Sequence, residues 1–191
     1  MKTMKMLQGT GVALITPFKA DKSVDVQALE QLVHYQIDNG VDYLVVLGTT
    51  AETPTLSAEE KELVKQTIKK ANAGRLPMVL GVGGNNTQAL IEQVQEVSPE
   101  DYVAILSVSP YYNKPSQEGI FQHYKALAQA SHVPILLYNV PSRTGSNIDY
   151  HTTLRLAKEV PNIIGIKEAS GNIVPVSYTH LRAHETPEHL V

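Results

Sequence analysis

The chain has 191 residues, of which 42% are hydrophobic and 18% charged, and its formal net charge is -3. This balance is typical of a soluble globular protein with a sizeable core, and without a basic stripe it gives no reason to expect a nucleic-acid partner. The absence of cysteine excludes disulfides and thiolate chemistry. We expect no signal peptide and no membrane partner, and a cytoplasmic protein is compatible with the composition.

Six apolar runs alternate with helical patterns, which is the order of a parallel α/β sheet. The predicted strands cover residues 11–16, 43–47, 77–82, 102–108, 134–138 and 163–166. The predicted helices cover 24–39, a segment that opens at Ser57 with a capping-box pattern, 87–97, 117–130 and 149–159. No strand alternates polar and apolar residues, so we expect every strand to be covered on both faces.

This order predicts an incomplete TIM (β/α)8 barrel with about six βα units. A Rossmann sheet is disfavoured, because no G-x-G-x-x-G motif follows the first strand and Gly9-Thr10-Gly11 precedes it. A closed barrel needs eight units and typically about 250 residues, so two units are missing from this pattern.

Distinctive polar residues follow the predicted strands at the edge where parallel α/β sheets bind ligands. Thr49 and Thr50 follow the second strand, and Tyr111 and Tyr112 follow the fourth. Tyr138 ends the fifth strand with Arg143 just beyond it, and Lys167 ends the sixth. Each residue alone has a structural explanation as a helix-entry turn, a rim side chain or a surface charge. Their shared position at one sheet edge favours a catalytic site.

These residue types suit Schiff-base chemistry on a keto acid. A lysine amine that attacks a carbonyl must be uncharged, which requires a dry, apolar pocket, and we expect such a pocket around Lys167. Tyr138 can shuttle protons, and Thr49 and Thr50 can bind a small carboxylate. Arg143 can hold a second carboxylate, and we expect no metal and no cofactor.

The sequence resembles the dihydrodipicolinate synthase / N-acetylneuraminate lyase family of class I aldolases from about residue 9 to residue 174. Four motifs carry the resemblance: Gly48-Thr-Thr-Ala-Glu52, Ser109-Pro-Tyr-Tyr-Asn-Lys-Pro115, Tyr138-Asn-Val-Pro-Ser-Arg-Thr-Gly145 and Gly165-Ile-Lys-Glu-Ala-Ser-Gly171. The resemblance implies that Lys167 forms an imine with pyruvate and that Tyr138 is the proton shuttle.

The resemblance also implies roles for the other residues. Thr49 would link Tyr138 to Tyr112 in a hydroxyl relay, with Tyr112 donated by a neighbouring subunit of a homotetramer built as a dimer of dimers. Thr50 would bind the pyruvate carboxylate. Arg143 would receive the carboxylate of aspartate 4-semialdehyde, which favours a synthase of lysine and diaminopimelate biosynthesis. The alternative within the family is a pyruvate-dependent lyase of a sugar acid, either N-acetylneuraminate or 2-keto-3-deoxygluconate.

The sequence departs from the family pattern at three positions. Ala51 stands where the family usually has a glycine, which would bias the turn if its φ angle were positive. Ala58 and Ala89 stand where lysine-inhibited members carry His and Glu, although Asn85 and Tyr111 of that allosteric site are retained. The resemblance therefore does not favour feedback inhibition by lysine.

From Pro175 the sequence matches neither the family nor the βα pattern. We interpret residues 1–174 as a partial TIM-barrel catalytic domain and residues 175–191 as a non-family tail, disordered or artefactual. The pattern indicates a C-terminal truncation. An open arc of six strands leaves two edges, so the further alternative is an inactive, poorly stable fragment that binds only small anions or partner subunits.

Overall fold

The computed structural model describes residues 2–172 and divides the chain into two compact units. The first unit comprises residues 1–82 and 97–106, and the second comprises 83–96 and 107–191, each to the extent that it is described. The prediction of one domain over residues 1–174 stays a prediction, and the tail 175–191 lies outside the described residues.

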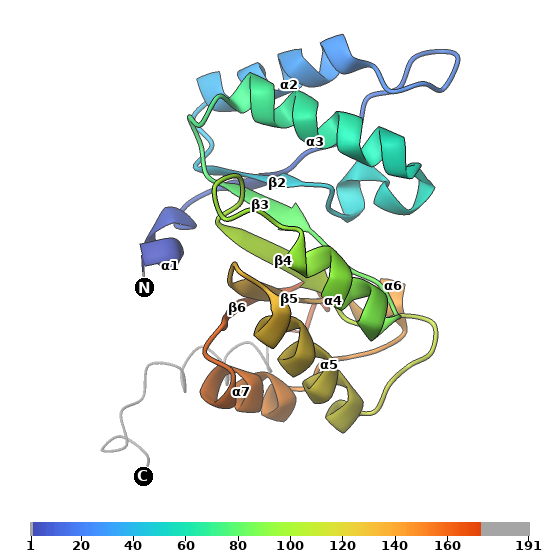
Figure 1. Ribbon diagram of the computed structural model, residues 1–191, viewed down its shortest axis with the longest axis vertical. Coiled ribbons are helices and arrows are strands. Elements are labelled where there is room, and N and C mark those ends of the chain that lie inside the picture. The colour runs from blue at the N-terminus through green and yellow to red at the C-terminus, as the bar shows by residue number, and fades with distance from the viewer. Residues whose placement is uncertain (1, 173–191) are drawn as a thin grey trace. The chain divides into compact units, whose positions relative to one another are not determined.

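The first unit contains four parallel strand segments with helices between them (Figure 1). Its elements are α1 (Lys2–Met6), β1 (Gly11–Ala13), α2 (Val26–Asp38), β2 (Tyr43–Val46), η1 (Thr49–Ala51), η2 (Thr53–Thr55), α3 (Ala58–Asn72), β3 (Met78–Gly81) and residues 104–106 of β4 (Ala104–Val108). β1 pairs with β2, β2 with β3, and β3 with β4, all in parallel.

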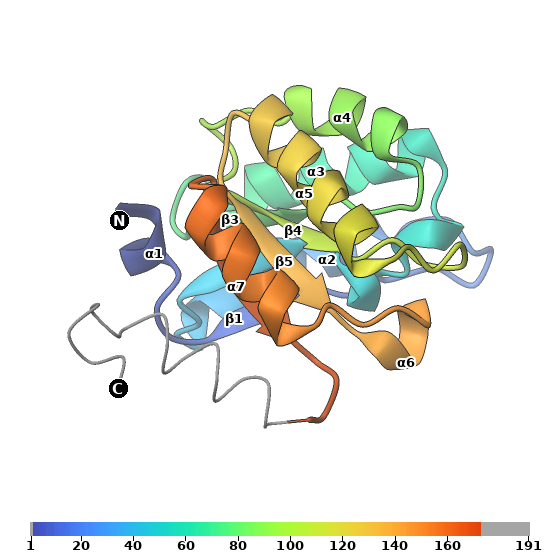
Figure 2. The same cartoon turned by 90° about the horizontal axis from the view of Figure 1, so that it is seen from below.

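The second unit continues the same pattern, and Figure 2 shows α5 beside α7. It contains α4 (Thr87–Gln95), the end of β4, α5 (Gln117–Ala130), β5 (Ile135–Asn139), α6 (Pro141–Thr144), α7 (Tyr150–Glu159) and β6 (Ile163–Glu168). β5 pairs with β6 in parallel, and the Ser109 N–H beyond β4 donates to the Tyr138 carbonyl of β5. Hydrogen-bonded strands thus follow chain order from β1 to β6, as predicted.

The helices form where the sequence places caps and apolar stripes. Ser57 and Glu60 complete the predicted capping box at the start of α3, because each side chain accepts a hydrogen bond from the backbone N–H of the other. Asp149 caps α7 in the same manner by accepting from the Thr152 N–H. The inner stripes of the helices are buried, for example Leu29 of α2.

The expectation that every strand is covered on both faces is wrong for β1 and β6. Residues of β2 to β5 are mostly buried, whereas Gly11 in β1 and Lys167 in β6 are exposed. The physical reason is that β1 and β6 each pair with one strand only among the described residues, so the side chains on their faces have neighbouring side chains on one flank only. In residues 2–172 we find no helix long and apolar enough to cross a bilayer.

Candidate active site

Lys167 and Tyr138 come together at the ends of β6 and β5. They are partners in the strand register, so both side chains project from the same face of the sheet. The Lys167 Nζ atom lies 4.5 Å from the centroid of the Tyr138 ring, and Tyr138 is buried. The geometry is that of a cation–π contact, which holds the amine over the phenol ring.

Lys167 is exposed, which differs from the dry pocket that the sequence predicts. Because β6 pairs with β5 alone among the described strands, no described strand covers its other edge. Lys167 forms no ion pair with another described residue. Its amine therefore remains open to a ligand on the face that it shares with Tyr138.

Arg143 lies on α6, a single helical turn in a segment for which the sequence predicts neither a strand nor a helix. The turn begins at Pro141, which is favourable in the first turn of a helix, and ends at Gly145 with φ +65°. Arg143 is exposed and its guanidinium forms no ion pair with another described residue. A planar guanidinium that is exposed and has no ion-pair partner is suited to binding a carboxylate through two parallel hydrogen bonds.

Tyr111 and Tyr112 lie in the segment that follows β4. Tyr112 is 88% exposed, has φ +72°, and its N–H donates to the Thr144 carbonyl at 3.4 Å. The Asn85 amide donates to the Tyr111 carbonyl at 3.1 Å, so the structure brings this predicted pair together. The contact uses the backbone of Tyr111, which leaves its ring partly exposed.

Thr49 and Thr50 are exposed residues of η1 in the first unit, immediately after β2. Their predicted roles in the relay and in carboxylate binding stay predictions. Ala51 causes no backbone strain, because Glu52 and not Ala51 has a positive φ angle, of 56°. The Ala51 carbonyl instead accepts a hydrogen bond from the Thr16 hydroxyl at 2.8 Å, and Ala51 is buried.

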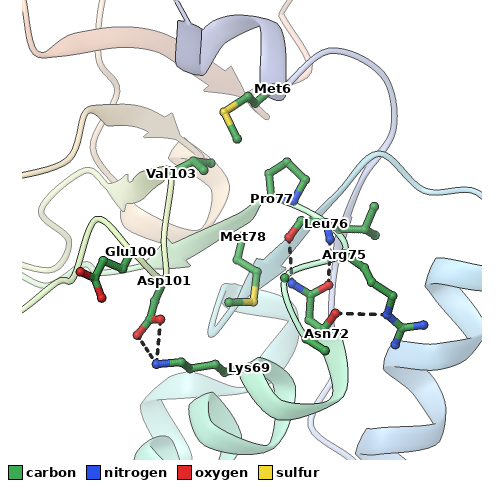
Figure 3. A pocket seen from close by; sticks show the side chains of 12 residues that line it. Met6, Lys69, Asn72, Arg75, Leu76, Pro77, Met78, Glu100, Asp101 and Val103 are labelled. Atoms are coloured by element: carbon green, nitrogen blue, oxygen red, sulfur yellow. Dashed lines mark hydrogen bonds and ion pairs between the residues drawn. The ribbon is translucent and has the colours of Figure 1, made fainter.

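A pocket of about 520 Å³ in the first unit contains none of the predicted site residues (Figure 3). Lys69 and Asp101 form an ion pair of 2.7 Å in its wall. The buried Asn72 amide donates to the Leu76 carbonyl and accepts from the Leu76 N–H. These polar groups already have partners, so they point to no ligand.

The sequence motifs predict no role for Asn139 and Glu168, although both residues fall within them. They directly follow Tyr138 and Lys167 and are themselves register partners. The Asn139 amide donates to Glu168 Oε2 at 2.9 Å. The sequence offered one signal for them, because each is a polar residue that directly follows a candidate catalytic residue. Successive side chains of a strand alternate between the two faces of the sheet, so both residues are expected on the opposite face.

The sequence model of the Dihydrodipicolinate synthetase family matches residues 6–191. The chain belongs to this family. The 4-hydroxy-tetrahydrodipicolinate synthase of Flavobacterium psychrophilum is 62% identical to it over 171 residues, which cover 90% of this chain and 58% of the relative. The chain therefore spans little more than half the length of that family member.

Solved structures of family members have the same fold. The dihydrodipicolinate synthase from Aquifex aeolicus superposes with a TM-score of 0.86 at 42% identity, covering 92% of this chain and 60% of that one. The enzyme from Acinetobacter baumannii in complex with pyruvate gives a TM-score of 0.86 at 43% identity, covering 91% of this chain and 61% of that one. The prediction of an incomplete TIM barrel with six βα units is confirmed.

Proposed function

We propose that this chain has the activity of a 4-hydroxy-tetrahydrodipicolinate synthase, which condenses pyruvate with aspartate 4-semialdehyde through a Schiff base on Lys167. The main support is the position of the Lys167 Nζ atom over the Tyr138 ring, on one face of β5 and β6. The synthase of Flavobacterium psychrophilum, which is 62% identical, supports the same reaction. A class I aldolase mechanism requires this combination of an amine and a neighbouring proton donor.

The reaction begins when the unprotonated Lys167 amine attacks the ketone carbon of pyruvate. Tyr138 supplies and removes the protons that carbinolamine formation and loss of water require. Loss of a proton from the pyruvate methyl group gives an enamine, whose carbon attacks the aldehyde carbon of the semialdehyde. The amino group of the semialdehyde then displaces Lys167 from the former ketone carbon, which closes the ring and frees the enzyme.

Two further residues select the substrates in this proposal. Thr50, with the backbone N–H groups of its turn, binds the pyruvate carboxylate. Arg143 binds the carboxylate of aspartate semialdehyde, and its guanidinium supports that role because it is exposed and forms no ion pair with another described residue. A substrate with a carboxylate beside its aldehyde is therefore favoured over the neutral aldehydes that sugar-acid lyases release.

We also propose that the active protein is a cytoplasmic homotetramer in which Tyr112 enters the site of a neighbouring subunit. The Tyr112 side chain is 88% exposed and its backbone has a φ angle of +72°, which supports a role in a neighbouring subunit. Bulky residues rarely adopt this conformation unless the surroundings impose it. Thr49 then connects the Tyr112 and Tyr138 hydroxyls.

Borohydride trapping tests the first step. Incubation with pyruvate and borohydride should attach a reduced three-carbon adduct to Lys167, as located by peptide mass spectrometry. The Lys167→Ala variant should remain unlabelled, while Lys158→Ala, which removes an exposed lysine of α7, should be labelled as the wild type is. Wild-type protein without an adduct at Lys167 would exclude the proposed function.

Turnover with different aldehydes tests the substrate. Pyruvate consumption should occur with aspartate semialdehyde and should be much slower with N-acetylmannosamine or glyceraldehyde. Arg143→Ala should raise the KM for the semialdehyde and leave the KM for pyruvate unchanged. Preference for a sugar aldehyde would instead identify a sugar-acid lyase.

A further inference from the structure

Asn139 joins three segments of the second unit through one buried side chain. The residue is 1% exposed. Its amide nitrogen donates to Glu168 Oε2 at 2.9 Å and to Asn147 Oδ1 at 2.9 Å, and its amide oxygen accepts from the Ile148 N–H at 3.0 Å. Both donors and an acceptor are therefore satisfied, as a buried amide requires.

Glu168 holds the other end of this network. Its second carboxylate oxygen accepts a hydrogen bond from the Ser170 N–H at 2.8 Å. The backbone connects the same strands, because the Ala169 N–H donates to the Asn139 carbonyl at 2.8 Å. The ends of β5 and β6 are thus connected by side-chain and backbone hydrogen bonds immediately after the residues that carry the chemistry.

The Asn139–Glu168 pair lies on the opposite face of the sheet from Lys167 and Tyr138. The register pairs Tyr138 with Lys167 and then Asn139 with Glu168, and successive side chains of a strand alternate between faces. The pair therefore cannot contact a substrate bound to Lys167. Its effect on the reaction can act only through residues that it holds in place, and the first of these are Tyr138 and Lys167, which precede it in the two strands.

Asn139 also closes the loop that carries Arg143. The Asn139 side chain bonds both Asn147 and the Ile148 N–H, so one residue holds the two ends of the segment 140–147. Gln117 of α5 supports the far end, because its amide donates to the Asn147 carbonyl at 2.7 Å and accepts from the Asp149 N–H at 3.1 Å. The position of Arg143 thus depends on the network that positions Lys167.

We propose that Asn139 and Glu168 are positioning residues that set Lys167 against Tyr138 and fix the Arg143 loop. This inference rests on the proposed Schiff-base function. A displacement of about 1 Å between reacting groups can reduce a rate by about 100-fold, so a hydrogen-bonded pair directly behind the amine has a large effect on turnover.

Exchanging the donor and acceptor across the pair tests the inference. Asn139→Asp places a second carboxylate against Glu168 and removes the amide donors. In the double variant Asn139→Asp with Glu168→Gln, the new amide donates to the new carboxylate and its oxygen still accepts from the Ser170 N–H. The Ile148 N–H keeps its acceptor, and the Asn147 amide can rotate to donate.

The rate of borohydride trapping at saturating pyruvate is the main measurement, with the dissociation constant of pyruvate measured separately. Asn139→Asp should lower the saturated rate about tenfold, which corresponds to about 1.4 kcal/mol, and weaken pyruvate binding little. The double variant should recover most of the rate. An unchanged rate in folded Asn139→Asp protein, or a double variant as slow as the single one, would overturn the inference.

Asn162→Asp is the matched control, because Asn162 is a hydrogen-bonded amide before the opposite end of β6. Its nitrogen donates to the carbonyls of Ala128, Ser131 and Val133. This variant should lose stability in a denaturant melt and keep the wild-type trapping rate below its melting range. Loss of stability alone would slow both variants equally, which would also contradict the positioning role.

Nuclear magnetic resonance separates this inference from the proposed function. The Lys167 Nζ atom lies over the Tyr138 ring, so the ring should shield the protons of the adjacent ε-methylene group without any substrate present. Asn139→Asp should move their resonance toward that of a free lysine, and the double variant should move it back. If wild-type protein forms no pyruvate adduct, the proposed function fails, and an unmoved resonance in Asn139→Asp would refute the positioning role independently.

Discussion

Thr87 of α4 and His123 of α5 form a hydrogen bond, with 2.8 Å between the Thr87 Oγ1 and His123 Nδ1 atoms. His123 is 4% exposed, and its Nε2 atom has no hydrogen-bond partner among the described residues. Burial lowers the pKa of His123 from 6.5 to about 4. The folded protein therefore keeps this ring neutral well below the pH at which the unfolded chain protonates it.

The first prediction is a loss of stability in mild acid. Above pH 6.5 the His123 ring is neutral in the folded and in the unfolded protein, so it does not change the free energy of unfolding as the pH varies. Between about pH 6.5 and pH 4 only the unfolded chain takes up the proton, so the free energy of unfolding falls by about 1.4 kcal/mol per pH unit, or about 3 kcal/mol in all. Urea melts from pH 7.5 to 4.5 measure this slope.

His123→Gln should flatten that slope, whatever its effect on stability at pH 7.5. His132→Gln is the control, because His132 is exposed and its replacement should leave the slope unchanged. Equal slopes in wild type and His123→Gln would show that another group causes the acid sensitivity.

The order of strands and helices was predictable because its signals are local. Apolar runs, helical spacing and caps lie within a few residues of the element that they specify, as at Ser57 and Glu60. The turn α6 was missed because four residues starting at Pro141 are too short to show a periodicity. Lys167 and Tyr138 could be proposed as candidates from sequence alone because each stands at the end of an apolar run.

The surroundings of these residues were not predictable from local signals. The exposure of Lys167 depends on which strands lie beside β6, and the role of Asn139 depends on contacts with residues 8, 9 and 29 positions away. An asparagine after a strand is usually a turn residue. Only the strand register reveals that it faces Glu168 behind the candidate catalytic pair.

The second prediction concerns the buried hydrogen bond from Tyr124 to Ser107. The Tyr124 hydroxyl donates to the Ser107 carbonyl at 2.9 Å, and neither residue is exposed. Burial raises the pKa of the phenol well above its usual range, so the group stays a donor. Tyr124→Phe should lower the free energy of unfolding by about 1–2 kcal/mol, because the carbonyl is left without this partner. Tyr35→Phe, at a side chain that is 62% exposed, should change it little in the same melts.

The third prediction concerns the capping box of α3. Ser57→Ala removes the acceptor of the Glu60 N–H and should destabilise the protein by about 1 kcal/mol. Ser57→Thr keeps a hydroxyl at the same position and should lose much less. Chemical denaturation of both variants at pH 7.5 measures the difference, and equal stabilities would mean that the cap contributes nothing.

The fourth prediction separates stability from activity at Tyr112. The φ angle of +72° is unfavourable for tyrosine and ordinary for glycine. Tyr112→Gly should therefore leave stability unchanged or raise it by up to about 1 kcal/mol, even though a side chain is lost. If Tyr112 belongs to the hydroxyl relay, turnover with pyruvate and aspartate semialdehyde should fall at the same time.

Two other variants identify the cause of that fall. Tyr112→Phe keeps the ring and removes the hydroxyl, so its turnover should fall as well while its stability stays near the wild-type value. Lys114→Gly relieves a second positive φ angle, of 45°, in the same segment and should leave turnover unchanged. Full turnover in Tyr112→Phe would exclude the hydroxyl relay, because the phenol oxygen is the only group that this variant lacks.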